Sequence, residues 1–325
     1  MPFEKLRDVV LNDGQTTELA MVVAPELSWR ERLCAYLNAP PQPEGPSLHQ
    51  FLLTHELPEL EARYFTMLRD GEVAGCIITT DGAAAGYINS TFVPRPLRQL
   101  GIAKNLMTAL EDDFGDRGGR VRFLTTRTGS PAEGMFEGFG YQSVWERNGR
   151  TGMEKHYEGN TWDSYFDGDP AGARVEEMTW AHWNPHRALM WTRHQAGYHP
   201  LDGGFFARMQ ECQVDSRTRW KALVSPEGKL VGNGVLRPHD RWVEEDGDSY
   251  TLDLYVHPGF RAAADILFEA AMPEAGHVQT FLDGDSQAEI TFFQERGFGL
   301  EVRLKDDFNH HNPSLPDIRV YGKTV

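Results

Sequence analysis

Cysteine is scarce in this sequence, and its thiols are far apart. The 325 residues include three cysteines, Cys34, Cys76 and Cys212, with no Cys-x-x-Cys pair. This spacing excludes a disulfide-stapled small fold and gives no zinc or redox motif. We expect all three cysteines to be reduced and to lie in the core.

Long apolar runs and excess positive charge are also missing. No stretch approaches the roughly 18 apolar residues of a membrane span, and residues 1–8 lack a basic-then-apolar leader. We therefore predict no membrane partner and a cytoplasmic location. The formal net charge of −16 argues against a nucleic-acid partner, because Lys and Arg must neutralise phosphates. The acidity mildly favours an amine substrate, although solubility alone is the more economical explanation.

The length and composition are those of two globular domains. At about 100 to 200 residues per domain, 325 residues exceed one compact unit. A content of 40% hydrophobic and 25% charged residues is typical of a protein that buries substantial cores.

One short segment combines a turn, a helix start and positive charge. An apolar run over residues 87–93 precedes Arg98-Gln-Leu-Gly-Ile-Ala-Lys104, and a helix pattern follows over residues 102–110. The first turn of a helix leaves main-chain N–H groups without partners, where the helix dipole favours an anion. The small residues would let a diphosphate approach, and the Arg and Lys would add donors. The pattern predicts a pyrophosphate seat; a helix start that binds nothing is the alternative.

This segment resembles motif A of the GNAT acyltransferases, in which an Arg/Gln-x-x-Gly-x-Gly/Ala turn after the fourth strand holds the pyrophosphate of acetyl-CoA. Arg98, Gly101 and Ala103 fill these positions. Residues 132–141 resemble the family's motif B, a helix followed by a Gly-aromatic pair. The resemblance covers most of residues 15–157. It implies an α/β (α+β) fold in which a mixed, mostly antiparallel twisted sheet is flanked by helices.

The resemblance also implies which residues bind the donor, acetyl-CoA or another short acyl-CoA. They belong to the fourth strand, the motif A turn and motif B: Phe92, Val93, Arg98, Gln99, Leu100, Gly101, Ile102, Ala103, Lys104, Ser130 and Phe136. Candidates for contact with the acceptor are Asn89, Thr91 and Tyr141. Each has an ordinary alternative, which is a strand filler for Asn89 and Thr91, a core aromatic for Tyr141, and a helix N-cap for Ser130.

The catalytic acid and base stay unknown. Many family members carry a tyrosine four residues before the Gly-aromatic pair, as the acid for the departing thiolate, and this sequence has Phe136 there. The strand that carries a glutamate base in some members corresponds to residues 122–126, which include no carboxylate. A thiol of ordinary acidity can leave without a donor, and water can carry the amine proton.

Three segments of the first half recur in order in the second half, displaced by roughly 160 positions, which indicates a duplicated domain. Residues 65–75 are echoed by 221–232, residues 92–98 by 255–261, and residues 136–141 by 293–298. Each half is expected to begin with a strand (17–23; 175–180), one or two helices (29–37; 186–195) and a hairpin (62–80; 218–236). Residues 158–173 are rich in turn formers. We predict a donor-binding domain over 1–157, a linker over 158–173 and a degenerate copy over 174–325.

The second copy is predicted to have lost the donor. Ala264 replaces the glycine of the turn, and Asp265 places an acid near the expected phosphate position. At an effective dielectric of about 20, two unit charges roughly 4 Å apart interact by about 4 kcal/mol, and here the sign is repulsive.

Two further patterns are set aside. His182-Trp-Asn-Pro-His186 and His310-His311 lack partner ligands at recognisable spacing, so no metal is predicted. The aromatic residues Trp180, Trp183, Trp191, Phe205 and Phe206 fit a core better than a ligand platform.

The resemblance therefore implies an N-acetyltransferase that transfers acetyl from acetyl-CoA to an amine by direct attack in a ternary complex. A small-molecule amine is the preferred acceptor. One alternative is a non-catalytic CoA-binding sensor or scaffold, which the missing Tyr and Glu support. The other is a protein N-acetyltransferase. The oligomeric state is open, with a homodimer as one option.

Overall fold

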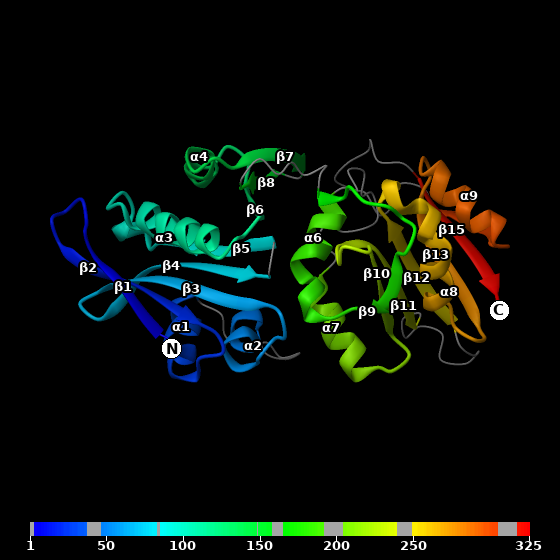
Figure 1. Ribbon diagram of the computed structural model, residues 1–325, viewed down its shortest axis with the longest axis horizontal. Coiled ribbons are helices and arrows are strands. Elements are labelled where there is room, and N and C mark those ends of the chain that lie inside the picture. Colours follow the sequence, from blue (N-terminus) through cyan, green and yellow to red (C-terminus); the bar gives the residue numbers. More distant parts are fainter. Residues whose placement is uncertain are drawn as a thin grey trace. The chain divides into compact units, whose positions relative to one another are not determined.

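A computed structural model describes residues 3–37, 47–82, 85–147, 149–157, 165–191, 204–238, 249–304 and 317–325 (Figure 1). The chain divides into two compact units, residues 1–162 and 163–325. The division falls within the segment predicted as a linker. Each unit is described by itself below. No helix in the described ranges is long and apolar enough to cross a membrane.

The first unit is an eight-stranded sheet with helices on both faces. Its strands are β1 (Phe3–Val10), β2 (Thr16–Val23), β3 (Glu61–Arg69), β4 (Glu72–Asp81), β5 (Ala85–Phe92), β6 (Val121–Arg127), β7 (Gln142–Arg147) and β8 (Arg150–His156). Its helices are α1 (Leu27–Tyr36), α2 (Leu48–Thr54), the short 3₁₀ turn η1 (Arg95–Leu97), α3 (Ile102–Asp116) and α4 (Pro131–Gly138).

The strand order is β1-β2-β3-β4-β5-β6-β8-β7, and every neighbouring pair is antiparallel except β5 and β6. The parallel pairing of β5 with β6 ends at Ile88 and Leu124, whereas β5 continues to Phe92 and β6 to Arg127. Beyond Ile88 the two strands therefore diverge. We call this opening the β5/β6 splay.

The helix α3 covers one face of the sheet, and α1 and α2 lie on the other (Figure 1). Buried residues recur along α3 at helical spacing, at Ile102, Leu106, Met107, Ala109, Leu110 and Phe114. They pack on Phe65, Met67 and Ile77 of the sheet. This packing fixes the position of the α3 N-terminus beside the splay.

The second unit repeats this architecture. Its elements are β9 (Arg174–Glu177), η2 (Trp180–His182), α6 (Trp183–Trp191), α7 (Phe205–Val214), β10 (Arg219–Val224), β11 (Leu230–Pro238), β12 (Ser249–Val256), η3 (Pro258–Ala263), α8 (Ala264–Ala271), β13 (His277–Asp283), α9 (Gln287–Glu295), β14 (Gly299–Leu304) and β15 (Ile318–Thr324). The strand order β9-β10-β11-β12-β13-β15-β14 matches that from β2 to β7 in the first unit. The predicted fold class, two mixed and mostly antiparallel sheets flanked by helices, is confirmed. The additional strand β1 was not predicted.

Candidate active site

The turn between β5 and α3 has a backbone that glycine makes accessible. Gly101 is the N-cap of α3 and has a φ of 88°, in the left-handed region that glycine adopts without strain. Gln99 also has a positive φ, of 67°. Leu100 between them does not have a positive φ, so the sign of φ alternates along this turn, as it does in an anion-binding nest.

The main-chain N–H groups of residues 99–104 have no hydrogen-bond partner within the described residues. The carbonyl groups of the turn are engaged instead. Asn12 donates to the oxygens of Gln99 and Leu100, at 2.8 and 3.1 Å, and Asn105 donates to the oxygen of Gly101. Since the acceptors are bound within the protein, the turn offers donors only. Main-chain donors arranged in this way at a helix N-terminus can bind an anion.

Two cations flank this turn. The side chains of Arg98 and Lys104 are both exposed. Arg98 Nε donates to the carbonyl oxygen of Val93, at 3.1 Å, and so ties the turn to the end of β5. The remaining guanidinium nitrogens and the Lys104 ammonium contribute positive charge beside the unpaired N–H groups.

The strand β5 is bulged where the splay opens. Its register against β4 shifts between Ile78 and Thr79, which makes Asn89 the bulged residue. The side-chain amide of Asn89 donates to Thr80 Oγ1 at 3.1 Å. The hydroxyl of Thr91 is buried and has no hydrogen-bond partner in the described ranges. The bulge bends β5 at the place where the splay opens, next to the unpaired Thr91 hydroxyl.

The end of β5 is partly open to solvent. The side chain of Phe92 is 41% exposed, and its ring packs edge-on against Tyr36 of α1, with centroids 5.4 Å apart. The Tyr36 hydroxyl donates to the Phe92 carbonyl oxygen at 3.3 Å. Burial raises the pKa of Tyr36, with the nearby Cys76 adding to the effect. Tyr36 therefore stays protonated and keeps this hydrogen bond at neutral pH.

Motif B lies mostly in the core. Ser130 caps α4 by accepting from the Glu133 N–H at 3.3 Å, which is the helix-cap role that the sequence left as an alternative. Phe136 is 4% exposed, and its ring centroid lies 5.8 Å from that of Tyr141. Tyr141 is itself buried, and its hydroxyl donates to Glu111 at 2.8 Å. The structure thus gives Tyr141 a core position rather than one on the splay.

Sequence reasoning missed a carboxylate on β8. The register places Thr80, Tyr87, Phe123 and Glu154 in one row across β4, β5, β6 and β8, so their side chains share the face that α2 covers. Glu154 is 8% exposed; its Oε1 lies 2.9 Å from His156 Nε2, and its buried Oε2 has no partner within the described part of the chain. Only the strand pairing shows that Glu154 is near the splay.

A match to a protein-family model agrees with this geometry. Residues 28–141 match the model of the acetyltransferase (GNAT) family. These residues form a GNAT domain. The matched range contains β3 to β6, the motif A turn and α4. No curated protein matches the chain.

Several solved structures resemble parts of the chain. The GNAT domain of PAT from S. lividans is 18% identical, with 46% of this chain and 96% of that one covered and a TM-score of 0.37. Ribosomal-protein-alanine N-acetyltransferase from Brucella melitensis is 16% identical, with 47% and 99% covered and a TM-score of 0.38. A GNAT family acetyltransferase from Elizabethkingia anophelis, with acetyl-CoA bound, is 13% identical, with 30% and 77% covered and a TM-score of 0.26.

The second unit lacks the open turn of the GNAT domain. Ala264, the counterpart of Gly101, has a right-handed backbone with φ of −64°, and its N–H donates to the Arg261 oxygen. The turn is therefore wound into η3, which continues directly into α8. The expectation that Asp265 would repel a phosphate at this turn needs correction, because the Asp265 carboxylate pairs with Arg296, whose Nε lies 2.9 Å away. The backbone conformation of this turn, rather than a negative charge, is what distinguishes it from the turn of the first unit.

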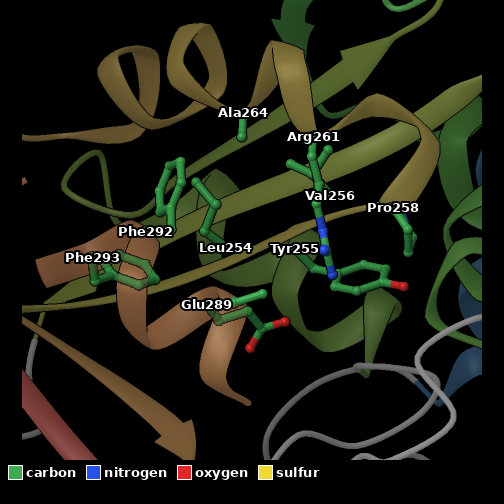
Figure 2. Close-up of a pocket in the computed structure, with 10 residues that line it drawn as sticks. Leu254, Tyr255, Val256, Pro258, Arg261, Ala264, Glu289, Phe292 and Phe293 are labelled. Carbon is green, nitrogen blue, oxygen red and sulfur yellow. The ribbon is translucent and has the colours of Figure 1, made fainter. Parts of the chain in front are cut away.

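A cavity of about 100 Å³ lies at the splay of the second unit (Figure 2). The parallel pairing of β12 with β13 ends at Thr251 and Gln279, so this splay persists. Figure 2 shows the lining, with Arg261 from η3, Glu289 from α9 and mainly apolar side chains. The full lining is Leu254, Tyr255, Val256, Pro258, Arg261, Ala264, Ala288, Glu289, Phe292 and Phe293.

The other two sequence patterns take structural positions. His182 Nε2 lies 3.0 Å from a Glu176 carboxylate oxygen, and His186 is buried beside Trp220. His310 and His311 lie outside the described residues. Trp183 stacks on Phe205 with centroids 5.6 Å apart and an interplanar angle of 8°, within the predicted aromatic core. Phe206 is half-buried at the edge of this cluster, whose other members Trp180, Trp183, Trp191 and Phe205 are buried.

Proposed function

We propose that the GNAT domain binds acetyl-CoA, or another short acyl-CoA, and transfers the acyl group to the amine of a small molecule in a ternary complex. The observation that carries this proposal lies at the start of α3. The main-chain N–H groups of residues 99–104 have no hydrogen-bond partner among the described residues. These donors suit a diphosphate, and Arg98 and Lys104 add positive charge. The donor supplies an activated thioester.

The β5/β6 splay is the place where we expect the thioester end of acetyl-CoA to bind. Main-chain groups of β5 beyond the bulge at Asn89, together with the Thr91 hydroxyl described above, would hold the pantetheine arm and the thioester carbonyl. Hydrogen bonds to that oxygen stabilise the negative charge that develops when an amine attacks. Holding both reactants at the splay supplies a further part of the rate enhancement.

We assign the role of general base to Glu154. Its buried Oε2 lies on the sheet face opposite α3, in the row next to the last paired residues of the splay. His156 holds the other carboxylate oxygen at 2.9 Å and so orients the group. A carboxylate held in this way can take the proton from the attacking amine. The thiolate leaves without a side-chain acid, since Phe136 has no proton to donate.

A CoA-binding sensor without catalysis is the second candidate. The observation that favours it is the buried Phe136, which leaves motif B without an acid. Under this alternative the turn binds the donor in the same way, and no acyl group is transferred. A protein acceptor is a third arrangement, which mass spectrometry of peptides incubated with the protein and acetyl-CoA would reveal.

Titration calorimetry with acetyl-CoA tests the binding step. Gly101→Glu fills the turn, strains a residue with φ of 88° and adds a negative charge, so binding is expected to be lost. Ala262→Glu is the matched control, because Ala262 is an exposed residue of η3 in the second unit, whereas the direct counterpart Ala264 is buried. Equal loss in both variants would contradict a single working turn.

Release of the CoA thiol over a panel of small amines tests the catalytic step. Turnover with at least one amine, abolished by Gly101→Glu, is the expected result. Tight acetyl-CoA binding without turnover on any amine or peptide would establish the sensor instead.

A further inference from the structure

Two arginines flank one tryptophan on the α6/α7 face of the second sheet. Arg208 of α7 has its guanidinium carbon 5.9 Å from the centroid of the Trp220 ring. Trp220 pairs with Val235 across β10 and β11, and Arg237 lies two residues beyond Val235 on the same face. His186 of α6 contacts the same ring, with centroids 5.1 Å apart and an interplanar angle of 88°.

One nitrogen atom on each of four side chains in this part of the second unit is buried and lacks a hydrogen-bond partner among the described residues. Arg208 Nη1, Arg237 Nε, His186 Nδ1 and Trp183 Nε1 are shielded from solvent and make no hydrogen bond within the described residues. In the same ranges no salt bridge involves Arg208 or Arg237. Buried polar atoms of this kind are ordinarily paired.

The charges in and around this cluster also favour a bound anion. Burial lowers the pKa of Arg208, and the positive charge of Arg237 lowers it further, whereas Asp253 and Glu211 oppose the effect. Burial also lowers the pKa of His186, to about 3, so that its imidazole is neutral. Arg237 is near enough for its charge to act on Arg208, and neither arginine has a salt-bridge partner among the described residues. A bound anion would offset both charges.

We propose that Arg208 and Arg237 together bind the carboxylate or phosphate group of a small-molecule anion. The planar guanidinium group donates parallel hydrogen bonds to either kind of anion. Both side chains are only half-buried, so an anion can reach them from solvent. This site belongs to the second unit and does not rest on the function proposed for the GNAT domain.

Calorimetric titration of the full chain with sodium phosphate and with sodium succinate tests the site, against sodium chloride of equal ionic strength. Each titration is repeated in a Gly101→Glu background, which removes the diphosphate seat proposed for the first unit. We expect saturable binding, with one anion bound per chain, in both the unsubstituted and the Gly101→Glu protein. Binding of phosphate alone would identify a phosphate ligand, and binding of succinate alone a carboxylate.

Arg208→Gln and Arg237→Gln are each expected to weaken this binding at least tenfold. Arg217→Gln is the matched control, since Arg217 lies in the same unit and pairs with Asp215 at 3.1 Å. Removal of one of two like charges should leave the unfolding temperature of the anion-free Arg237→Gln protein unchanged or raised. The proposal is overturned if neither anion gives saturable heat above sodium chloride, or if Arg217→Gln loses as much affinity.

Discussion

Gly75 of β4 lies directly beneath Ile102, the first residue of α3. A Cβ atom on Gly75 would lie 2.3 Å from Ile102 Cγ2, closer than atoms in a folded protein approach, and 3.2 Å from Leu106 Cδ1, which is a tight contact. The absence of a side chain at Gly75 therefore sets how near the α3 N-terminus comes to the sheet. The turn of residues 98–104, which we call the donor turn, carries its N–H groups at this N-terminus. Gly75 therefore also sets the position of these groups.

Gly75→Ala should displace α3 and weaken the binding of acetyl-CoA at the donor turn. We expect a loss of about 1 to 3 kcal/mol in the free energy of unfolding from overpacking, and a weaker affinity for acetyl-CoA in calorimetry. Gly134→Ala is the control, because Gly134 is exposed within α4 and a Cβ atom there would have no described atom within 4 Å beyond its own helix. Alanine there should be neutral or stabilising by up to about 1 kcal/mol. An unchanged affinity in Gly75→Ala would contradict the link between α3 packing and binding.

The donor turn could be predicted because its determinants are local. A strand, a glycine and a helix start lie close together along the chain, and the positive φ of Gly101 follows from the glycine itself. The internal repeat predicted the second sheet for the same reason, since matched segments recur in order. The equal strand orders of the two units bear out that comparison.

Other features depend on contacts that the sequence does not display. The role of Asp265 was misjudged because, without a glycine, the backbone at Ala264 stays right-handed and the turn winds into η3. Arg296, distant in sequence, then captures the Asp265 carboxylate. Glu154 was missed because its proximity to the splay follows from the pairing of β6 with β8. Register of this kind is a tertiary property.

Asn12 should hold the donor turn in its binding conformation. Its side chain and its main-chain N–H bind the oxygens of Gln99 and Leu100, so that the N–H groups of the turn face outward. Asn12→Ala removes the side-chain bond, worth about 1 kcal/mol, and we expect a roughly fivefold weaker affinity for acetyl-CoA. Asp13→Asn is the control, because Asp13 pairs with Arg69 and makes no described contact with the turn. Equal loss in both variants would refute a specific role for Asn12.

Glu154→Gln should separate chemistry from binding. The substitution keeps the shape of the side chain but removes the group that we assign as base. We expect kcat to fall by about 100-fold, within the usual range for loss of a general base, with unchanged acetyl-CoA affinity. Glu146→Gln on the exposed part of β7 should leave both quantities unchanged. A Glu154→Gln enzyme with normal kcat would remove Glu154 from the mechanism.

His186 should make the second unit sensitive to acid. Burial, with the charges of Arg208 and Arg187, lowers the pKa of this histidine from 6.5 to about 3. Between these values the unfolded chain binds a proton that the folded chain does not, so stability falls as the pH drops below about 6.5. The slope from one such group is at most about 1.4 kcal/mol per pH unit.

Urea unfolding between pH 7 and pH 4 measures this effect. The unsubstituted chain should lose stability more steeply than His186→Phe, in which the ring position holds no titrating group. His277→Phe serves as the control, because His277 is a half-buried histidine of the same unit that lies 3.0 Å from Glu301. It should retain the steep slope. If His186→Phe and the unsubstituted chain lose stability in parallel over this range, the buried imidazole is not the group responsible.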